Sequence, residues 1–317
     1  MPIPTPQDTK SSPDLHAFVR ANGRLPRIGD GVSPWRYRGW LLLHVQLADF
    51  HSELPGRWQH YMRTLDVGHL LDESIPRLDF ADRPGSDGLQ MVSRAIDLIY
   101  HCEGSLSAFN RLIEWLGWGL AVTKEQPSLD DSLNEKLYRH FNLEPLLLQP
   151  HDYLGEILVE RRGNGWNPNA FYPTPHTVVE LMVQMTMRTA GIDDSALRAN
   201  SKPESDSAST LSEEGRDPRL RTVCDPCVGT GRMLLHASNY SYCLYGCDID
   251  PLVALITKIN GAIYAPWLSF PFPQEILGIP VPPAPPARLP LPQEHQPPVG
   301  VPVFRTDDRG QGLLEFD

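Results

Sequence analysis

The chain has 317 residues, of which 41% are hydrophobic and 21% charged, so it can bury a sizeable core and is not disordered throughout. A net charge of −11 argues against nucleic-acid binding through overall charge, although a local basic face is compatible with it. Its five cysteines are too few for a disulfide framework, no apolar run approaches the roughly 18 residues of a membrane span, and the first residues show no secretory signal. We therefore expect a cytoplasmic protein without membrane contact.

Residues 1–33 are rich in proline, serine and glycine, which predicts a flexible arm. Arginines cluster in and directly after this segment, where acidic residues are few. Such a cluster is typical either of a contact with nucleic-acid phosphates or of an ordinary solvated face. The arginines are Arg20, Arg24, Arg27, Arg36 and Arg38.

Residues 34–150 show the helical period of apolar residues without the alternation of a strand, which predicts an N-terminal helical domain. Several sets of apolar residues recur at helical spacing and are expected to face the core. These sets are Leu41, Leu42, Val45 and Ala48; Val92, Ile96 and Ile99; Leu112, Ile113 and Leu116; and Leu133, Leu137 and Phe141.

A second part of the chain, residues 151–265, contains a further helix. Thr174 followed by Pro175 is typical of a helix start, and Gly191 predicts its end. Residues 192–218 are polar, charged and rich in serine, which predicts a disordered loop. The stripe of this helix that is expected to be buried consists of Val178, Leu181, Met182 and Met185.

After this loop the pattern changes to strand, glycine-rich turn, helix, strand, acidic turn and helix. Asp250 and Pro251 supply the cap and the first residue of the second helix. This order predicts the beginning of a doubly wound parallel sheet, so the expected fold class is α/β with a partial Rossmann-like sheet. Residues 266–317 form a proline-rich tail that is expected to be extended, with one more strand near residues 300–308.

The glycine-rich turn Asp225–Gly231 is the segment most suited to binding a ligand. Its glycines let a ligand approach the backbone, and Asp248 stands at the end of the second strand, where a carboxylate accepts hydrogen bonds from ribose hydroxyls. Leu234 occupies the place of the third glycine of the dinucleotide-binding motif, which argues against a nicotinamide cofactor. The alternative is a tight turn that binds no ligand.

The segment Asp225–Gly231 closely resembles the S-adenosylmethionine-binding motif of the adenine-N6-specific DNA methyltransferases, and Gly246–Pro251 resembles the acidic motif that follows it. Phe171–Pro175 resembles the Phe-Tyr-Thr-Pro segment of that family, with one extra proline. Asp152–Gly155 resembles an Asp-x-x-Gly helix in the modification subunits of type I restriction–modification systems. The resemblance covers about residues 150–264 and implies an S-adenosylmethionine-dependent methyltransferase domain.

The resemblance implies how the methionine and ribose parts of the cofactor are held. Asp225 would bind the methionine amino group, directly or through water. Gly229, Thr230 and Gly231 would line the methionine moiety, and Asp248 would bind the ribose.

The remaining contacts implied by the resemblance involve apolar and aromatic side chains. Ile249 would pack on the adenine ring, and Phe171, Tyr172 and Thr174 would close over the methionine end of the cofactor. The inserted Pro173 changes the spacing of this segment. For the two aromatic residues, the alternative is core packing against the following helix.

The resembling enzymes transfer a methyl group to N6 of an adenine flipped out of DNA, using an Asn- or Asp-Pro-Pro-aromatic motif. That motif is absent from the sequence, so no catalytic residue is assigned. The resemblance therefore implies a DNA adenine methyltransferase that meets its DNA target through a partner chain or a further domain. The alternatives are a non-catalytic regulatory or decoy subunit of a restriction–modification system, and a methyltransferase that acts on protein or RNA.

Two cysteine pairs have spacings close to those of zinc sites, namely Cys224 with Cys227 and Cys243 with Cys247. However, Cys227 falls inside the glycine-rich turn, where it would not be free to bind zinc. We therefore expect buried free thiols and no metal.

Overall fold

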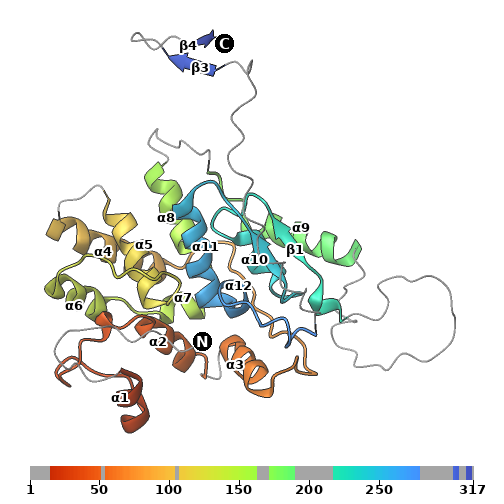
Figure 1. Ribbon diagram of the computed structural model, residues 1–317. Coiled ribbons are helices and arrows are strands. Elements are labelled where there is room, and N and C mark those ends of the chain that lie inside the picture. Colours follow the sequence, from red (N-terminus) through yellow and green to blue (C-terminus); the bar gives the residue numbers. More distant parts are fainter. Residues whose placement is uncertain are drawn as a thin grey trace, which may run out of the picture. The chain divides into compact units, whose positions relative to one another are not determined.

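The computed structural model describes residues 15–50, 54–103, 107–162, 171–189, 217–278, 303–306 and 312–315. The chain divides into two compact units, Met1–Gly278 and Ile279–Asp317. The described residues form a mixed α/β fold that is mostly helical (Figure 1). The loop predicted at 192–218 lies outside the described residues except for its last two positions, as do residues 1–14 of the predicted arm and most of the predicted tail.

The helical nature predicted for residues 34–150 is confirmed. Most residues of the predicted apolar sets are buried, and Val92, Ile99 and Leu112 are fully so. The exceptions are Leu42, Ala48 and Phe141, which are half-buried. Asp130 caps helix α6, because its side chain accepts a hydrogen bond from the backbone N–H of Leu133. The helices of this part are α2 (Trp40–Ala48), α3 (Arg57–Val67), α4 (Ser86–Glu103), α5 (Ala108–Gly119), α6 (Asp131–His140) and α7 (Glu144–Leu148), preceded by a 3₁₀ turn at Pro34–Arg36.

The described part of the segment predicted to be a flexible arm is folded against these helices. It contains helix α1 (Leu15–Asn22). Val32 is buried, and the Tyr138 hydroxyl donates a hydrogen bond of 3.0 Å to the carbonyl of Pro26. Proline and glycine therefore shape turns here rather than a free arm.

Several arginines of the basic cluster are held by neighbours within the chain. Arg24 forms an ion pair with Asp30 at 2.9 Å, and Arg36 forms one with Asp131. Arg38 donates hydrogen bonds to the backbone carbonyls of Ala121 and Thr123. For these three residues the structure favours an intramolecular role over a contact with nucleic-acid phosphates.

The predicted order of strands and helices after the loop is confirmed. Strands β1 (Val223–Asp225) and β2 (Leu244–Gly246) pair in parallel and form a two-stranded sheet. Asp250 caps α11 (Pro251–Tyr264), since its Oδ1 accepts a hydrogen bond of 3.0 Å from the N–H of Leu252. The other helices of this part are α8 (Tyr153–Arg162), α9 (His176–Thr189), α10 (Arg232–Ala237) and α12 (Pro266–Ser269), with a 3₁₀ turn at Pro218–Leu220.

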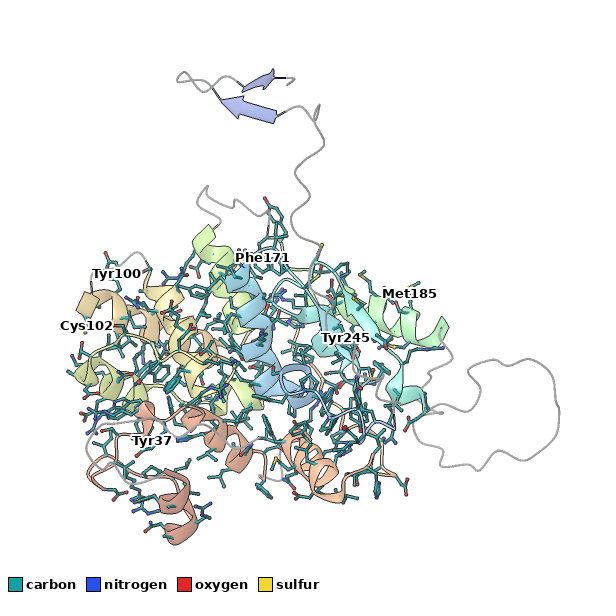
Figure 2. The ribbon with its side chains drawn as sticks, viewed as in Figure 1. Tyr37, Tyr100, Cys102, Phe171, Met185 and Tyr245 are labelled. Atoms are coloured by element: carbon teal, nitrogen blue, oxygen red, sulfur yellow. The ribbon has the colours of Figure 1, made fainter. Side chains whose placement is uncertain are left out.

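The prediction of which face of α9 is buried is wrong. Its four residues are exposed, and the helix instead buries Val179, Val183 and Met187. This opposite face packs against α10, which lies beside α9 (Figure 1). Both faces of α9 are apolar, so the helical period alone could not decide between them. Figure 2 labels Met185, one of the exposed residues of the predicted stripe.

The parts predicted as separate domains, 34–150 and 151–265, belong to one compact unit. Buried hydrogen bonds join them: Trp58 Nε1 donates to the carbonyl of Ala262 at 2.9 Å, and a ring nitrogen of His60 lies 2.6 Å from the Tyr242 hydroxyl. Where the extended tail was predicted to begin, Pro266 instead starts the short helix α12, which lies beside α3 (Figure 1). Proline is well suited to that first helical position.

The second unit contains strands β3 (Val303–Thr306) and β4 (Gly312–Glu315), which pair antiparallel. Strand β3 falls where the sequence predicts a terminal strand. Within the described ranges, no helix is both long and apolar enough to cross a membrane.

Candidate functional site

A pocket of about 390 Å³ opens where β1 and β2 end. Its walls are the aromatic segment Phe171–Thr174, the glycine-rich turn Asp225–Thr230 and the acidic segment Asp248–Asp250. The carboxyl ends of parallel strands meet at one edge of a sheet, which brings the last two segments together. Of the predicted cofactor-binding residues, all except Gly231 line this pocket, and Gly231 caps the helix directly behind it.

Two glycines of the turn adopt backbone conformations that other residues avoid. Gly229 has a φ of +56° and Gly231 a φ of +93°. A Cβ atom on Gly231 would lie 3.0 Å from the Thr257 side chain, and one on Gly229 would lie 3.3 Å from the ring of Phe171. The turn is therefore closely packed behind the pocket, and Phe171 (labelled in Figure 2) lies against it.

Three backbone N–H groups of the turn, those of Cys227, Val228 and Gly229, are bonded within the protein. The N–H of Gly229 donates to Asp248 Oδ2 at 2.9 Å, and that of Cys227 donates to Asp225 Oδ1 at 3.1 Å. The N–H of Val228 donates to the carbonyl of Cys247 at 3.0 Å. A loop that cradles phosphate needs such N–H groups free to bind the anion. This turn presents carboxylates to the pocket instead.

The three carboxylates of the pocket have different roles. Asp250 is buried and caps α11. Asp248 is fixed by two backbone donors, because its Oδ1 also accepts from the N–H of Asp250 at 2.9 Å. The lone pairs that remain on Asp248 and Asp225 can accept hydrogen bonds from hydroxyl or ammonium groups of a ligand.

Two large side chains flank the mouth of the pocket. Tyr172 is 79% exposed and Ile249 is 85% exposed. The alternative of core packing is therefore wrong for Tyr172, whereas Phe171 is partly buried against Gly229. Exposed apolar surface at the rim of a pocket is suited to pack against a flat ring of a ligand.

A buried carboxylate lies behind the glycine-rich turn and was given no role by the sequence. Asp152 is fully buried, and its Oδ1 accepts hydrogen bonds of 2.9 Å from the N–H of Gly155 and from Asn260 Nδ2. Its Oδ2 accepts from Arg232 Nε at 2.8 Å and from the Thr230 hydroxyl. The Asp-x-x-Gly pattern was the only sequence signal for this cluster, because the partners lie far along the chain.

Arg232 connects this carboxylate to the aromatic wall of the pocket. Arg232 lines the pocket, and its buried guanidinium donates to the carbonyl of Thr174 at 3.1 Å and to Glu156 Oε1 at 2.7 Å. Hydrogen bonds from His151 and then from Arg232 lower the pKa of Glu156 to about 2. Glu156 therefore remains a carboxylate. Together with Asp152, it compensates the positive charge of Arg232.

Two buried histidines lie beside this cluster. His176 Nδ1 and His236 Nε2 are 2.9 Å apart, so one ring donates a hydrogen bond to the other. Burial lowers the pKa of His236 to about 4 and that of His176 to about 2. Both rings are therefore neutral at physiological pH.

We expect His236 to make the protein less stable in acid. The pKa of His236 is about 4 in the folded protein against 6.5 for the ordinary group, so the unfolded chain binds more protons below about pH 6.5. The free energy of unfolding should fall between pH 6.5 and 4, with His236 contributing about 2–3 kcal/mol of that loss. Urea unfolding over this pH range should show a shallower decline for His236→Gln than for wild type. The exposed residue His101 provides the matched variant His101→Gln, and equal slopes for all three proteins would contradict the expectation.

The five cysteines, all within the described residues, form no disulfide, and Cys243 is the buried one. Cys224, Cys227 and Cys247 are exposed, which differs from the prediction that they are buried. Within the described part of the chain, no three histidine, cysteine or acidic side chains are grouped in a way that could hold a metal ion.

No family model, no curated protein and no solved structure matches this chain. The assignment of a function therefore depends on the chemistry of the pocket and on the motifs that line it.

Proposed function

We propose that this chain binds S-adenosylmethionine in the pocket at the ends of β1 and β2. The observation that supports this most strongly is that three N–H groups of the glycine-rich turn, those of Cys227, Gly229 and Val228, donate to Asp225, Asp248 and a backbone carbonyl, respectively. A nucleotide phosphate would find carboxylates rather than free donors there, and like charges repel. A ligand with ribose hydroxyls, an ammonium group and a positive sulfonium is complementary to such a wall.

Each part of the cofactor has a complementary group in the pocket. Asp248 accepts hydrogen bonds from the ribose hydroxyls, and Asp225 accepts from the methionine ammonium group. Ile249, exposed at the mouth, provides apolar surface for the adenine ring, and Tyr172, also exposed there, closes over the methionine end. The volume of about 390 Å³ is within the usual range for ligand pockets, roughly 300–1,000 Å³.

The arrangement of elements also supports a methyltransferase-like sheet. Strands β1 and β2 are parallel and joined through α10, which is the unit from which a Rossmann-like sheet is built. We propose that they are the first two strands of such a sheet. The acidic residue at the end of β2 then occupies the usual ribose-binding position.

We expect Asp248→Ala to weaken S-adenosylmethionine binding by at least about tenfold, because a charge-assisted hydrogen bond is worth roughly 1.5–3 kcal/mol. Calorimetric titration of the whole chain measures this directly. Asp248→Asn keeps a hydrogen-bond acceptor without the charge, so its affinity should lie between those of wild type and Asp248→Ala. Asp97→Ala, an exposed change on α4, is the matched control and should bind as wild type does. Equal affinity of wild type and Asp248→Ala would rule out the proposed ribose contact.

We further propose that the bound cofactor serves methylation of adenine N6 in DNA together with a partner chain. Methyl transfer requires acceptors that orient the adenine amino group, and the sequence has no Asn- or Asp-Pro-Pro-aromatic motif to supply them. The same observation favours a second candidate, a regulatory subunit that binds the cofactor without turnover. Labelled methyl incorporation into unmethylated genomic DNA distinguishes them, measured with the chain alone and with products of adjacent genes. Incorporation only in the mixture supports the shared enzyme, and none in either case supports the regulatory subunit.

A further inference from the structure

A buried positive charge forms part of the wall of the proposed cofactor pocket. Arg232 lines the pocket and is only 6% exposed. The reactive centre of S-adenosylmethionine is a positive sulfonium, which such a wall would repel unless the guanidinium were neutralised. The pocket therefore needs counter-charges behind Arg232 if it binds a cation.

Asp152 supplies the more deeply buried of these counter-charges. It is fully buried, and the groups that bond to it include the N–H of Gly155, the NH₂ group of Asn260 and the Arg232 guanidinium, all of which can only donate. The acceptor oxygens of a carboxylate match such donors. Glu156, which is partly exposed, neutralises the other side of the guanidinium at 2.7 Å.

The same carboxylate fixes the position of the glycine-rich turn and of the aromatic wall. Thr230 donates its hydroxyl to Asp152, while Asn260 Nδ2 holds the carbonyl of Thr230 at 2.9 Å. Through Arg232, the carboxylate is also linked to the carbonyl of Thr174 in the aromatic segment. Any change at Asp152 therefore acts on both walls that face the methionine end of the ligand.

We infer that Asp152 is a positioning and specificity-determining residue. Its carboxylate holds Arg232 in place and compensates the positive charge of the guanidinium, so that the pocket accepts a sulfonium. This inference rests on the proposed binding of S-adenosylmethionine. Its consequence is a preference that depends on ligand charge. S-adenosylhomocysteine has the same shape without the methyl group and with a neutral thioether, so the two ligands differ mainly in that charge.

Asp152→Asn isolates the charge, because asparagine keeps an acceptor for Gly155 and Asn260 and can donate to the Thr230 hydroxyl. The Asp152→Asn variant loses the hydrogen bond from Arg232, so Glu156 is then the one carboxylate that is bonded to the guanidinium. We expect the affinity for S-adenosylmethionine to fall on the order of tenfold more than that for S-adenosylhomocysteine. The double variant Asp152→Asn with Arg232→Gln removes both charges and should restore the wild-type ratio of the two affinities.

Calorimetric titration of the full chain with each ligand separately tests these expectations. Asp97→Asn is the matched control, since it removes an exposed carboxylate on α4 outside the pocket and should leave both affinities and their ratio unchanged. If Asp152→Asn does not fold, Glu156→Gln tests the same inference. Its ratio of the affinities for S-adenosylmethionine and S-adenosylhomocysteine should shift in the same direction by a smaller factor. Equal weakening of both ligands, or a double variant that does not restore the ratio, would overturn the inference and leave Asp152 as a packing residue. If wild type bound neither ligand, the proposed function itself would fail, and the inference with it.

Discussion

Replacing Trp267 with alanine is expected to lower the free energy of unfolding by about 3–5 kcal/mol, the usual cost of removing a buried aromatic side chain. Trp267 is fully buried, and its ring packs edge-on against Tyr242 and beneath the guanidinium of Arg57, 4.5 Å away. Its indole N–H donates to the carbonyl of Ser241 at 3.1 Å, so truncation would also leave a buried acceptor without its partner.

Urea denaturation followed by circular dichroism measures this loss. Tyr245 is 56% exposed on β2, and Tyr245→Ala should change the free energy of unfolding by less than about 0.5 kcal/mol. A loss of the same size in both variants would contradict the placement of Trp267 between α3 and the sheet.

The second large effect is expected for Gly155→Ala, which should destabilise the protein by about 2–4 kcal/mol. A Cβ atom at this position would lie 2.0 Å from Asp152 Oδ2 and 2.8 Å from Asp152 Oδ1. The carboxylate cannot move aside without losing its bonds to Arg232 and Asn260, which would leave a buried charge poorly paired.

Thermal and urea unfolding of Gly155→Ala should be compared with Glu160→Ala, an exposed change on the same helix. Alanine raises helix propensity in both variants, so propensity alone predicts a small gain for Gly155→Ala. A variant as stable as wild type would show that Asp152 is not held as tightly as its hydrogen bonds indicate.

Much of the fold could be predicted from local sequence signals. The helical stretch depends on apolar residues at helical spacing, and the start of α11 depends on Asp250 followed by Pro251, both of which act within a few residues. The exposed stripe of α9 could not be predicted, because Val179 and Val178 are equally apolar and only the position of α10 decides which is buried. The placement of Trp267 likewise depends on Arg57, which is distant in sequence.

The candidate site likewise has some features that local sequence signals predict and others that depend on distant residues. The motifs at Asp225 and Asp248 predict the residues that surround the pocket, because the ends of neighbouring parallel strands are always close. The role of Arg232 could not be predicted, since its partner Asp152 is 80 positions away and no local pattern joins them. Long-range polar clusters of this kind follow only from the tertiary structure.

Photolabelling with methyl-labelled S-adenosylmethionine is the most direct test of the proposed pocket. Ultraviolet irradiation of the whole chain with this cofactor, followed by proteolysis and mass spectrometry, identifies the residues that lie against it. The proposed site predicts label on peptides that contain Phe171–Thr174 or Asp225–Ile249, and a loss of that label when excess S-adenosylhomocysteine is present. Label confined to other parts of the chain, or no label that S-adenosylhomocysteine can displace, would contradict the proposal.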